Sequence, residues 1–329
     1  MTRVRYVAFR VLQTAFLLWF VLTFLFFFFR LMPGDFTNRM LYAGASPETI
    51  EATRAKWGLD DPLYVQYYRY LVNMLTLDAG VSRQFRVPVW EYVKMKIFNS
   101  FILIAPAITL SFVIGSAWGT IIGNKRGSRL EKYGHIPIIV VGTFPEFFTA
   151  MVLIIVFAAW FGWVPTSGLM DPSVASQYAE AAWWRPYLTR SFAEHYVLPF
   201  TAVVMWSLLL PTLVMRTSIV EVRNQDFMYY HRLTGLGNRQ VLKHLGKHAS
   251  LPVITLYPVM MTRAIGGLVL IEIVFNWPGI GDALVDAVLA RDFPIMQFVF
   301  FLAAAWVIIA NFVVDLVYGF VDPRVSVES

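Results

Sequence analysis

Residues 101–123 read FILIAPAITLSFVIGSAWGTIIG, a run of 23 residues without a single charged side chain. A helix needs about 20 mainly apolar residues to cross the hydrocarbon layer of a membrane, which is roughly 30 Å thick. This one stretch therefore predicts a membrane-spanning helix, and it sets the class of fold expected for the rest of the chain.

Five further apolar runs of similar length occur in the 329-residue chain, at residues 11–29, 136–161, 196–215, 251–275 and 294–320. Together the six runs predict an all-α, polytopic membrane protein with six transmembrane helices. The composition agrees, because 58% of the residues are hydrophobic and 15% are charged, whereas soluble domains average about 25% charged residues. This composition disfavours an isolated soluble enzyme. The first run is longer than the core of a signal peptide, so we expect it to be a retained anchor.

The distribution of basic residues predicts the orientation, because Lys and Arg in short loops resist translocation and mark the cytoplasmic side. Fourteen of them fall in the N-terminus, the loops after the second and fourth runs, and the C-terminal tail. The short segments on the opposite side carry three, Arg185, Arg190 and Arg291. This asymmetry predicts that both termini are cytoplasmic, and it accounts for the net charge of +6 without a nucleic-acid partner.

These patterns divide the chain into an N-terminal transmembrane helix (residues 1–31), an extracytoplasmic region (32–100), a five-helix core (101–320) and a cytoplasmic tail (321–329). The core contains a basic cytoplasmic segment, residues 216–250, in which two helical patterns flank a glycine turn at 235–237. A short amphipathic helix joined to a spanning helix can pass movement to a partner protein. An ordinary positively charged loop explains the same pattern, and the residues alone do not choose between the two.

Motifs for several kinds of chemistry are missing from the sequence. The phosphate-binding loop G-x-x-x-x-G-K-[ST] does not occur, and neither do H-E-x-x-H, G-x-S-x-G or G-x-G-x-x-G. The lack of cysteine excludes thiol catalysis, iron–sulfur ligation and cysteine-based zinc sites. His244 and His248 share a helix face, but no carboxylate lies between them. We therefore expect no metal site and no cofactor bound by this chain.

Four ionisable residues fall inside predicted spans, where each costs about 2.5–3.5 kcal/mol unless it is sheltered. Asp315 lies toward the cytoplasmic end of its span, where exposure at the membrane surface suffices, so we expect it to be structural. Glu146 follows Pro145, where a bent helix could line a cavity; an interhelical pair is the alternative. Arg263 and Glu272 are nine positions apart, so on a continuous helix they face opposite sides and need separate partners. Glu146, Arg263 and Glu272 are our candidates for a translocation path.

The sequence resembles the B-type permease subunits of ATP-binding-cassette importers for dipeptides, oligopeptides and nickel. The resemblance covers nearly the whole chain and consists of eight pieces in register. These are LMPGD at 31–35, GLDDPLYVQYY at 58–68, GWVP at 162–165, DF at 226–227 with GL at 235–236, LPV at 251–253, WPGIG at 277–281, ARDFP at 290–294 and VDPR at 321–324.

The resemblance implies the importer permease fold and a coupling segment, residues 223–248, that docks on a separate ATPase. The matching positions predicted to make this contact are Arg223, Asp226, Arg232, Gly235, Leu236 and Arg239. It also implies a second related permease, two ATPase subunits that bind ATP and Mg, and an extracytoplasmic substrate-binding protein. The chain itself would then not be an enzyme, and it would work by alternating access as a multi-pass protein of a prokaryotic cell membrane.

Peptides are the cargo that the resemblance favours, with sugars and nickel chelates as alternatives. Two other classes of function compete with an importer. One is an intramembrane enzyme that uses Glu146 with Arg263, and the other is a channel that needs no nucleotide. Activity of the isolated chain, without any ATPase, distinguishes both from the importer.

Overall fold

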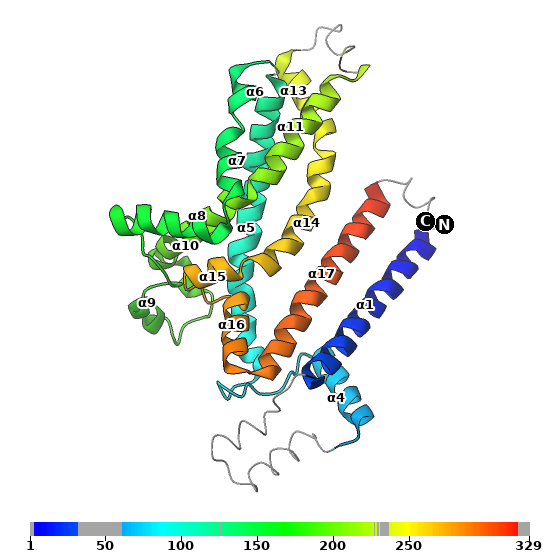
Figure 1. Ribbon diagram of the computed structural model, residues 1–329, viewed down its shortest axis with the longest axis vertical. Coiled ribbons are helices and arrows are strands. Elements are labelled where there is room, and N and C mark those ends of the chain that lie inside the picture. The colour runs from blue at the N-terminus through cyan, green and yellow to red at the C-terminus, as the bar shows by residue number, and fades with distance from the viewer. Residues whose placement is uncertain are drawn as a thin grey trace. The chain divides into compact units, whose positions relative to one another are not determined.

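The computed structural model describes residues 3–31, 61–125, 127–226, 228, 230 and 237–321. Regular structure in these ranges is helical, apart from one isolated bridge between Val81 and Pro88. The chain forms two compact units, one of Met1–Lys94 with Leu284–Ser329 and the other of Met95–Ala283. We refer to them as unit 1 and unit 2, and Figure 1 shows their helices.

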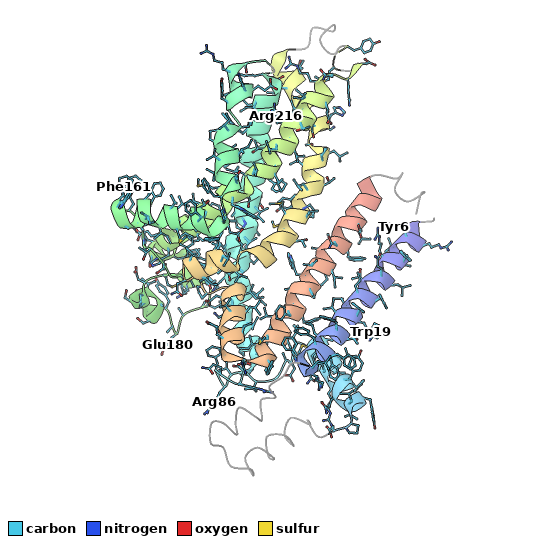
Figure 2. All side chains as sticks on the ribbon, in the orientation of Figure 1. Tyr6, Trp19, Arg86, Phe161, Glu180 and Arg216 are labelled. Carbon is cyan, nitrogen blue, oxygen red and sulfur yellow. The ribbon has the colours of Figure 1, made fainter. Side chains whose placement is uncertain are left out.

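Unit 1 contains α1 (Arg3–Leu31), α4 (Leu63–Leu75) and α17 (Phe293–Val321), and α1 lies alongside α17. Near one end of the pair, Arg10 forms an ion pair with Asp315 at 3.0 Å. Near the other end, the ring of Phe29 contacts that of Phe293, with centroids 6.0 Å apart. Trp19 projects from an exposed face of α1 (Figure 2), as expected of a helix that presents aromatic side chains to lipid.

A buried carboxylate organises the turn before α5 (Val89–Asn124) within unit 1. Asp292, directly before α17, accepts hydrogen bonds from Ser82 Oγ at 2.6 Å and from the Gln84 backbone N–H at 3.0 Å. Ser82 Oγ in turn accepts the Phe85 N–H at 2.9 Å. A carboxylate that is 1% exposed is thereby supplied with donors and fixes the turn.

Unit 2 contains most of α5 and the first turn of α16 (Ile280–Ala290). Its other helices are α6 (Arg129–Tyr133), α7 (Ile136–Thr143), α8 (Glu146–Leu153), η1 (Ile154–Trp160), α9 (Pro172–Gln177), η2 (Arg185–Leu188), α10 (Arg190–Ser207), α11 (Leu209–Arg223), α13 (Asn238–Ala249), α14 (Leu251–Gly267) and α15 (Val269–Val274). Its buried core comes from α5, α8, α10, α11 and the α13–α15 series.

Four helices of the described ranges are long and apolar enough to cross a membrane: Arg5–Leu31, Val89–Asn124, Arg190–Arg223 and Phe293–Val313. A fifth span results if the bent pair Arg129–Thr143 and Glu146–Trp160 counts as one. The apolar stretch of α14, Leu251–Thr262, is shorter than these. Four to five of the six expected spans are therefore present as such, and the sixth stays a prediction.

The third predicted span is broken, by an angle of 98°, between α7 and α8. Pro145 lacks a backbone N–H, and its ring pushes the preceding residue into an extended conformation. Phe144 has φ −71° and ψ 147°, as this rule requires. The expected bend at Pro145 is therefore confirmed, although it is sharper than a kink within one continuous helix.

Small residues let α5 and α11 approach closely within unit 2. A Cβ atom added at Gly119 would lie 2.6 Å from the Thr212 carbonyl oxygen, and one at Gly123 would lie 2.8 Å from Ile219 Cγ2. At Gly115 the nearest atoms of Pro211 and Thr212 are 3.0 Å away. Three glycines at intervals of four residues thus form the contact face, which is the usual device for helix association in lipid.

Candidate functional site

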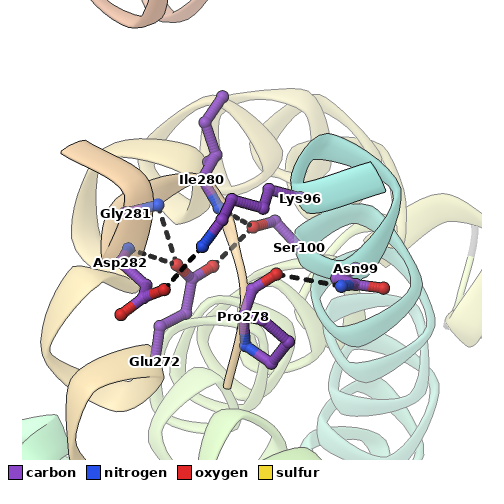
Figure 3. Close-up of polar contacts among 8 residues, drawn as sticks. All are labelled: Lys96, Asn99, Ser100, Glu272, Pro278, Ile280, Gly281 and Asp282. Atoms are coloured by element: carbon purple, nitrogen blue, oxygen red, sulfur yellow. Dashed lines mark hydrogen bonds and ion pairs between the residues drawn. The ribbon is translucent and has the colours of Figure 1, made fainter. Parts of the chain in front are cut away.

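The side chain of Glu272, on α15, is 1% exposed and lies in a network of hydrogen bonds (Figure 3). Ser100 Oγ of α5 donates to Glu272 Oε1 at 2.5 Å. The backbone N–H groups of Gly281 and Asp282 donate to Oε2 at 2.7 Å and 3.0 Å. Both carboxylate oxygens are therefore occupied by donors, which offsets the cost of burying the group.

Further polar contacts join the same loop to the N-terminal half of α5 (Figure 3). Asn99 Nδ2 donates to the Pro278 carbonyl oxygen at 2.9 Å, and Lys96 Nζ lies 2.8 Å from Asp282 Oδ2. The indole N–H of Trp277 donates to the Asn99 carbonyl oxygen at 3.1 Å. We call the set Lys96, Asn99, Ser100, Glu272 and residues 277–282 the polar knot, and every member belongs to unit 2.

The glycines of the WPGIG motif explain why the chain can close around a carboxylate. A Cβ atom at Gly279 would lie 2.2 Å from Glu272 Cδ, and one at Gly281 would lie 2.8 Å from Val269 Cα. Asn276 introduces the turn with a φ of 48°, a conformation that asparagine tolerates better than most residues. The motif thus provides the space that Glu272 occupies.

Glu272 also caps α16 from outside that helix. Gly281 and Asp282 lie in the first turn of α16, whose N–H groups have no partner within the helix. A negative group beside these N–H groups is favoured by the helix dipole as well. The polar knot therefore fixes the direction in which α16 leaves the loop.

The other two candidates for a translocation path occupy different surroundings. Glu146 is half-buried and is the first residue of α8, immediately after the bend, and no hydrogen bond or ion pair of its carboxylate involves another described residue. Arg263 is on α14, while its side chain lies outside the described part. The expectation that Arg263 and Glu272 face opposite sides presumed one helix over residues 251–275, but the helix is interrupted at Leu268.

The described coupling residues belong to or directly follow α11 and α13, which lie with α6 at one end of unit 2 (Figure 1). Arg223, in the last turn of α11, donates a hydrogen bond to the Asn124 carbonyl oxygen. Asp226 is exposed, and Arg239 lies in the first turn of α13. Arg232, Gly235 and Leu236 fall outside the described residues.

The second helix of the coupling segment has two distinct faces. Leu245 and Ala249 of α13 are buried against unit 2, whereas Lys243 and Lys247 are exposed. The helical pattern expected after the glycine turn is confirmed as α13, Asn238–Ala249. A basic, exposed helix anchored by apolar residues is suited to contact an acidic partner surface.

Sequence reasoning missed the partners of Glu272. Ser100, Asn99 and Lys96 precede or begin the apolar run, where polar residues are ordinary at a membrane boundary. A signal was nevertheless available, because a buried carboxylate requires donors and the glycine-rich loop that follows could supply them. Among the described residues, no group of three or more His, Cys, Asp or Glu side chains is placed to hold a metal ion.

Long apolar helices with buried polar contacts between them define a polytopic α-helical membrane protein. Comparison with protein families identifies the kind of membrane protein. The model of the binding-protein-dependent transport system inner membrane component matches residues 115–327, and the model of the N-terminal part of such components matches residues 3–96. The chain belongs to this family of transport permeases.

Individual relatives agree with the family models. The oligopeptide transport system permease protein AppB of Bacillus subtilis (strain 168) is 30% identical over 297 residues, which cover 89% of this chain and 90% of AppB. The glutathione transport system permease protein GsiC of Escherichia coli (strain K12) is 31% identical over 301 residues, with 91% and 92% covered. The resemblance noted from the motifs is thereby confirmed.

Proposed function

We propose that this chain is the membrane-spanning permease subunit of an ATP-driven, binding-protein-dependent importer of peptides. The observation that carries the proposal is the alignment with two permeases over about nine tenths of each chain. One of these relatives is named for oligopeptides, and the other for glutathione, which is itself a small peptide. Peptides are therefore preferred over sugars or nickel chelates as cargo.

In this proposal, separate proteins hydrolyse the ATP that drives transport. The sequence has no phosphate-binding loop, so ATP and Mg would bind to two partner ATPase subunits. These subunits would contact the coupling segment at residues 223–248. A second, related permease completes the translocation path, and a substrate-binding protein delivers the peptide from outside. Closure of the ATPases then drives alternating access.

The membrane topology is part of the same proposal. Six crossings require that the α7–α8 pair and the α14–α15 pair each count as one span, and the basic loops then place both termini in the cytoplasm. In support, Arg223 of α11 contacts Asn124 at the end of α5, so the two basic loops after the second and fourth runs lie at one end of unit 2.

Reconstitution tests the proposal and separates it from its rivals. The chain, its partner permease and ATPases would be placed in lipid vesicles with the binding protein, and uptake of radiolabelled trialanine and glutathione would be measured. We expect uptake that requires ATP and every subunit. Uptake by the chain alone without nucleotide would establish a channel, and conversion of a substrate by the chain alone would establish an enzyme. Uptake of maltose or nickel–histidine in place of both peptides would correct the cargo.

A further inference from the structure

A single carboxylate organises the connection between α5 and α7. Ser128 Oγ accepts the Glu131 N–H at 3.2 Å and so begins α6, while Glu131 Oε2 accepts the Gly127 N–H at 2.6 Å. Gly127 has a φ of 81°, which favours glycine. The carboxylate is thereby held in one orientation, with Oε1 directed away from the loop's own backbone.

That second oxygen meets a cation from α11. Arg216 lies at the end of unit 2 where α6 and α11 come together (Figure 2), and its NH2 group is 3.2 Å from Glu131 Oε1. The side chains are 30% and 17% exposed, so the ion pair is partly shielded from solvent. Shielding makes such a pair stronger than one on the open surface.

Arg216 itself has little freedom to move relative to α5. A Cβ atom added at Gly119 would lie 3.1 Å from the Arg216 backbone nitrogen, and one at Gly123 would lie 3.0 Å from its carbonyl oxygen. The guanidinium therefore extends from a position where the backbones of α5 and α11 are closely packed.

The loop has further attachments on both sides. Arg223, two helical turns after Arg216 and hence on the same face of α11, donates to the Asn124 carbonyl oxygen. Trp118 of α5 donates to the Gly134 carbonyl oxygen at 2.8 Å. The described part of the 124–135 loop is thus joined to α5 through Gly134 and to α11 through Glu131, and Arg223 joins α11 to the end of α5. The helix α11 leads into the coupling segment.

We infer that Glu131 and Arg216 are positioning residues for the coupling segment. They fasten the 124–135 loop to α11, so that α5, this loop and α11 move as one body when an ATPase displaces the segment. Without the pair, the loop would move partly independently of α11, and ATP hydrolysis would be less completely converted into transport. This inference rests on the proposed function, since it assumes that an ATPase contacts the segment.

Spin labels can test the inference directly, because the chain contains no cysteine and two substitutions give a unique label pair. Arg129→Cys in the loop and Glu221→Cys on α11 are both exposed positions. Electron–electron distances would be measured in the assembled transporter, nucleotide-free and trapped with ATP and vanadate. We expect the same distance in both states in the otherwise unaltered chain, and a broader or shifted distribution on trapping when Glu131→Gln is added. A shift on trapping with Glu131 intact would overturn the inference.

Glu131→Gln removes the negative charge selectively, because the amide oxygen can still accept the hydrogen bond from the Gly127 N–H. We expect trialanine uptake per ATP hydrolysed to fall about fivefold, as for the loss of one partly shielded ion pair. Arg216→Gln should have a similar effect, and the double variant should be no worse than either single variant, because the two side chains act through one contact. Glu194→Gln, which breaks the exposed Arg190–Glu194 pair on α10, is the matched control and should leave the ratio unchanged.

The outcomes separate this inference from the proposed function. If the ATPases co-purify with the chain and uptake needs ATP, yet Glu131→Gln and Arg216→Gln leave the ratio and the distances unchanged, only the inference is wrong. Additive losses in the double variant would also contradict it. If no ATPase associates with the chain, the proposed function is wrong and the inference is lost with it.

Discussion

Ser100 Oγ lies 2.5 Å from Glu272 Oε1, which joins two residues 172 positions apart in the sequence through a buried hydrogen bond. Ser100 Oγ also accepts the Ile280 N–H at 2.8 Å. The serine therefore links the carboxylate on α15 with the first residue of α16. Removal of either side chain should affect the loop between these helices.

Glu272→Ala should destabilise unit 2 strongly. The Gly281 and Asp282 N–H groups would lose a buried acceptor, at a cost of about 1–3 kcal/mol each. Intrinsic tryptophan fluorescence during heating of the detergent-solubilised transporter would report the change, since Trp277 belongs to the knot and is fully buried. Glu272→Gln should be milder, because one acceptor oxygen remains. Equal melting temperatures for Glu272→Ala and the unaltered chain would show that the knot contributes nothing to stability.

Gly279→Ala should also destabilise the chain, although it adds one methyl group. The new carbon would lie 2.2 Å from Glu272 Cδ, so the carboxylate or the loop must shift, at about 1–3 kcal/mol. Gly246→Ala is the matched control, because nothing lies within 4 Å of a Cβ atom at that helical position. There we expect a gain of about 1 kcal/mol from helix propensity. The prediction fails if both substitutions shift the melting temperature in the same direction.

Cysteine labelling should reveal the orientation of unit 2. Ser173→Cys on α9 and Arg129→Cys in the loop after α5 are both exposed. The distribution of basic residues predicts that position 173 is outside and position 129 is in the cytoplasm. A membrane-impermeant maleimide should therefore label Ser173→Cys in intact cells, and Arg129→Cys only after the membrane is opened. The reverse pattern would invert the proposed topology.

Gly235→Val should abolish ATP-dependent uptake while leaving the chain inserted in the membrane. The resemblance places Gly235 in the turn that docks on the ATPase, and a β-branched side chain is poorly tolerated where a turn requires glycine. Uptake of trialanine and the amount of chain recovered from membranes would be compared for the two proteins. Unimpaired uptake would remove Gly235 from the coupling contact.

The apolar runs at residues 11–29, 101–123 and 294–320 predicted their helices because twenty apolar residues have few alternatives in lipid. Helix ends were less predictable: α5 begins at Val89, before its run, since amphipathic residues extend the helix beyond the membrane boundary. The bend at Pro145 followed from local chemistry. The interruption at Leu268 was not predicted, although Gly266 and Gly267 directly before it are poor helix formers.

The polar knot shows where sequence reasoning ended. The cost of burying a carboxylate singled out Glu272, but its donor Ser100 could be found only from a contact between distant segments. The pairing of Glu131 with Arg216 was missed for the same reason, since the two residues are 85 positions apart and belong to different helices. Local rules predict which groups need a partner, and the tertiary structure decides which partner is within reach.

The ion pair between Arg10 and Asp315 has a consequence for biosynthesis. α1 leaves the ribosome before α17. The ion pair can therefore form only after another 305 residues, up to Asp315, have been synthesised. At about 5–20 residues per second, this interval lasts roughly 15–60 s. During it, the Arg10 guanidinium can bond to Tyr6 and Gln13 of its own helix, but the carboxylate that balances its charge is absent. The pairing of α1 with α17 therefore forms only after all the segments between them have been synthesised.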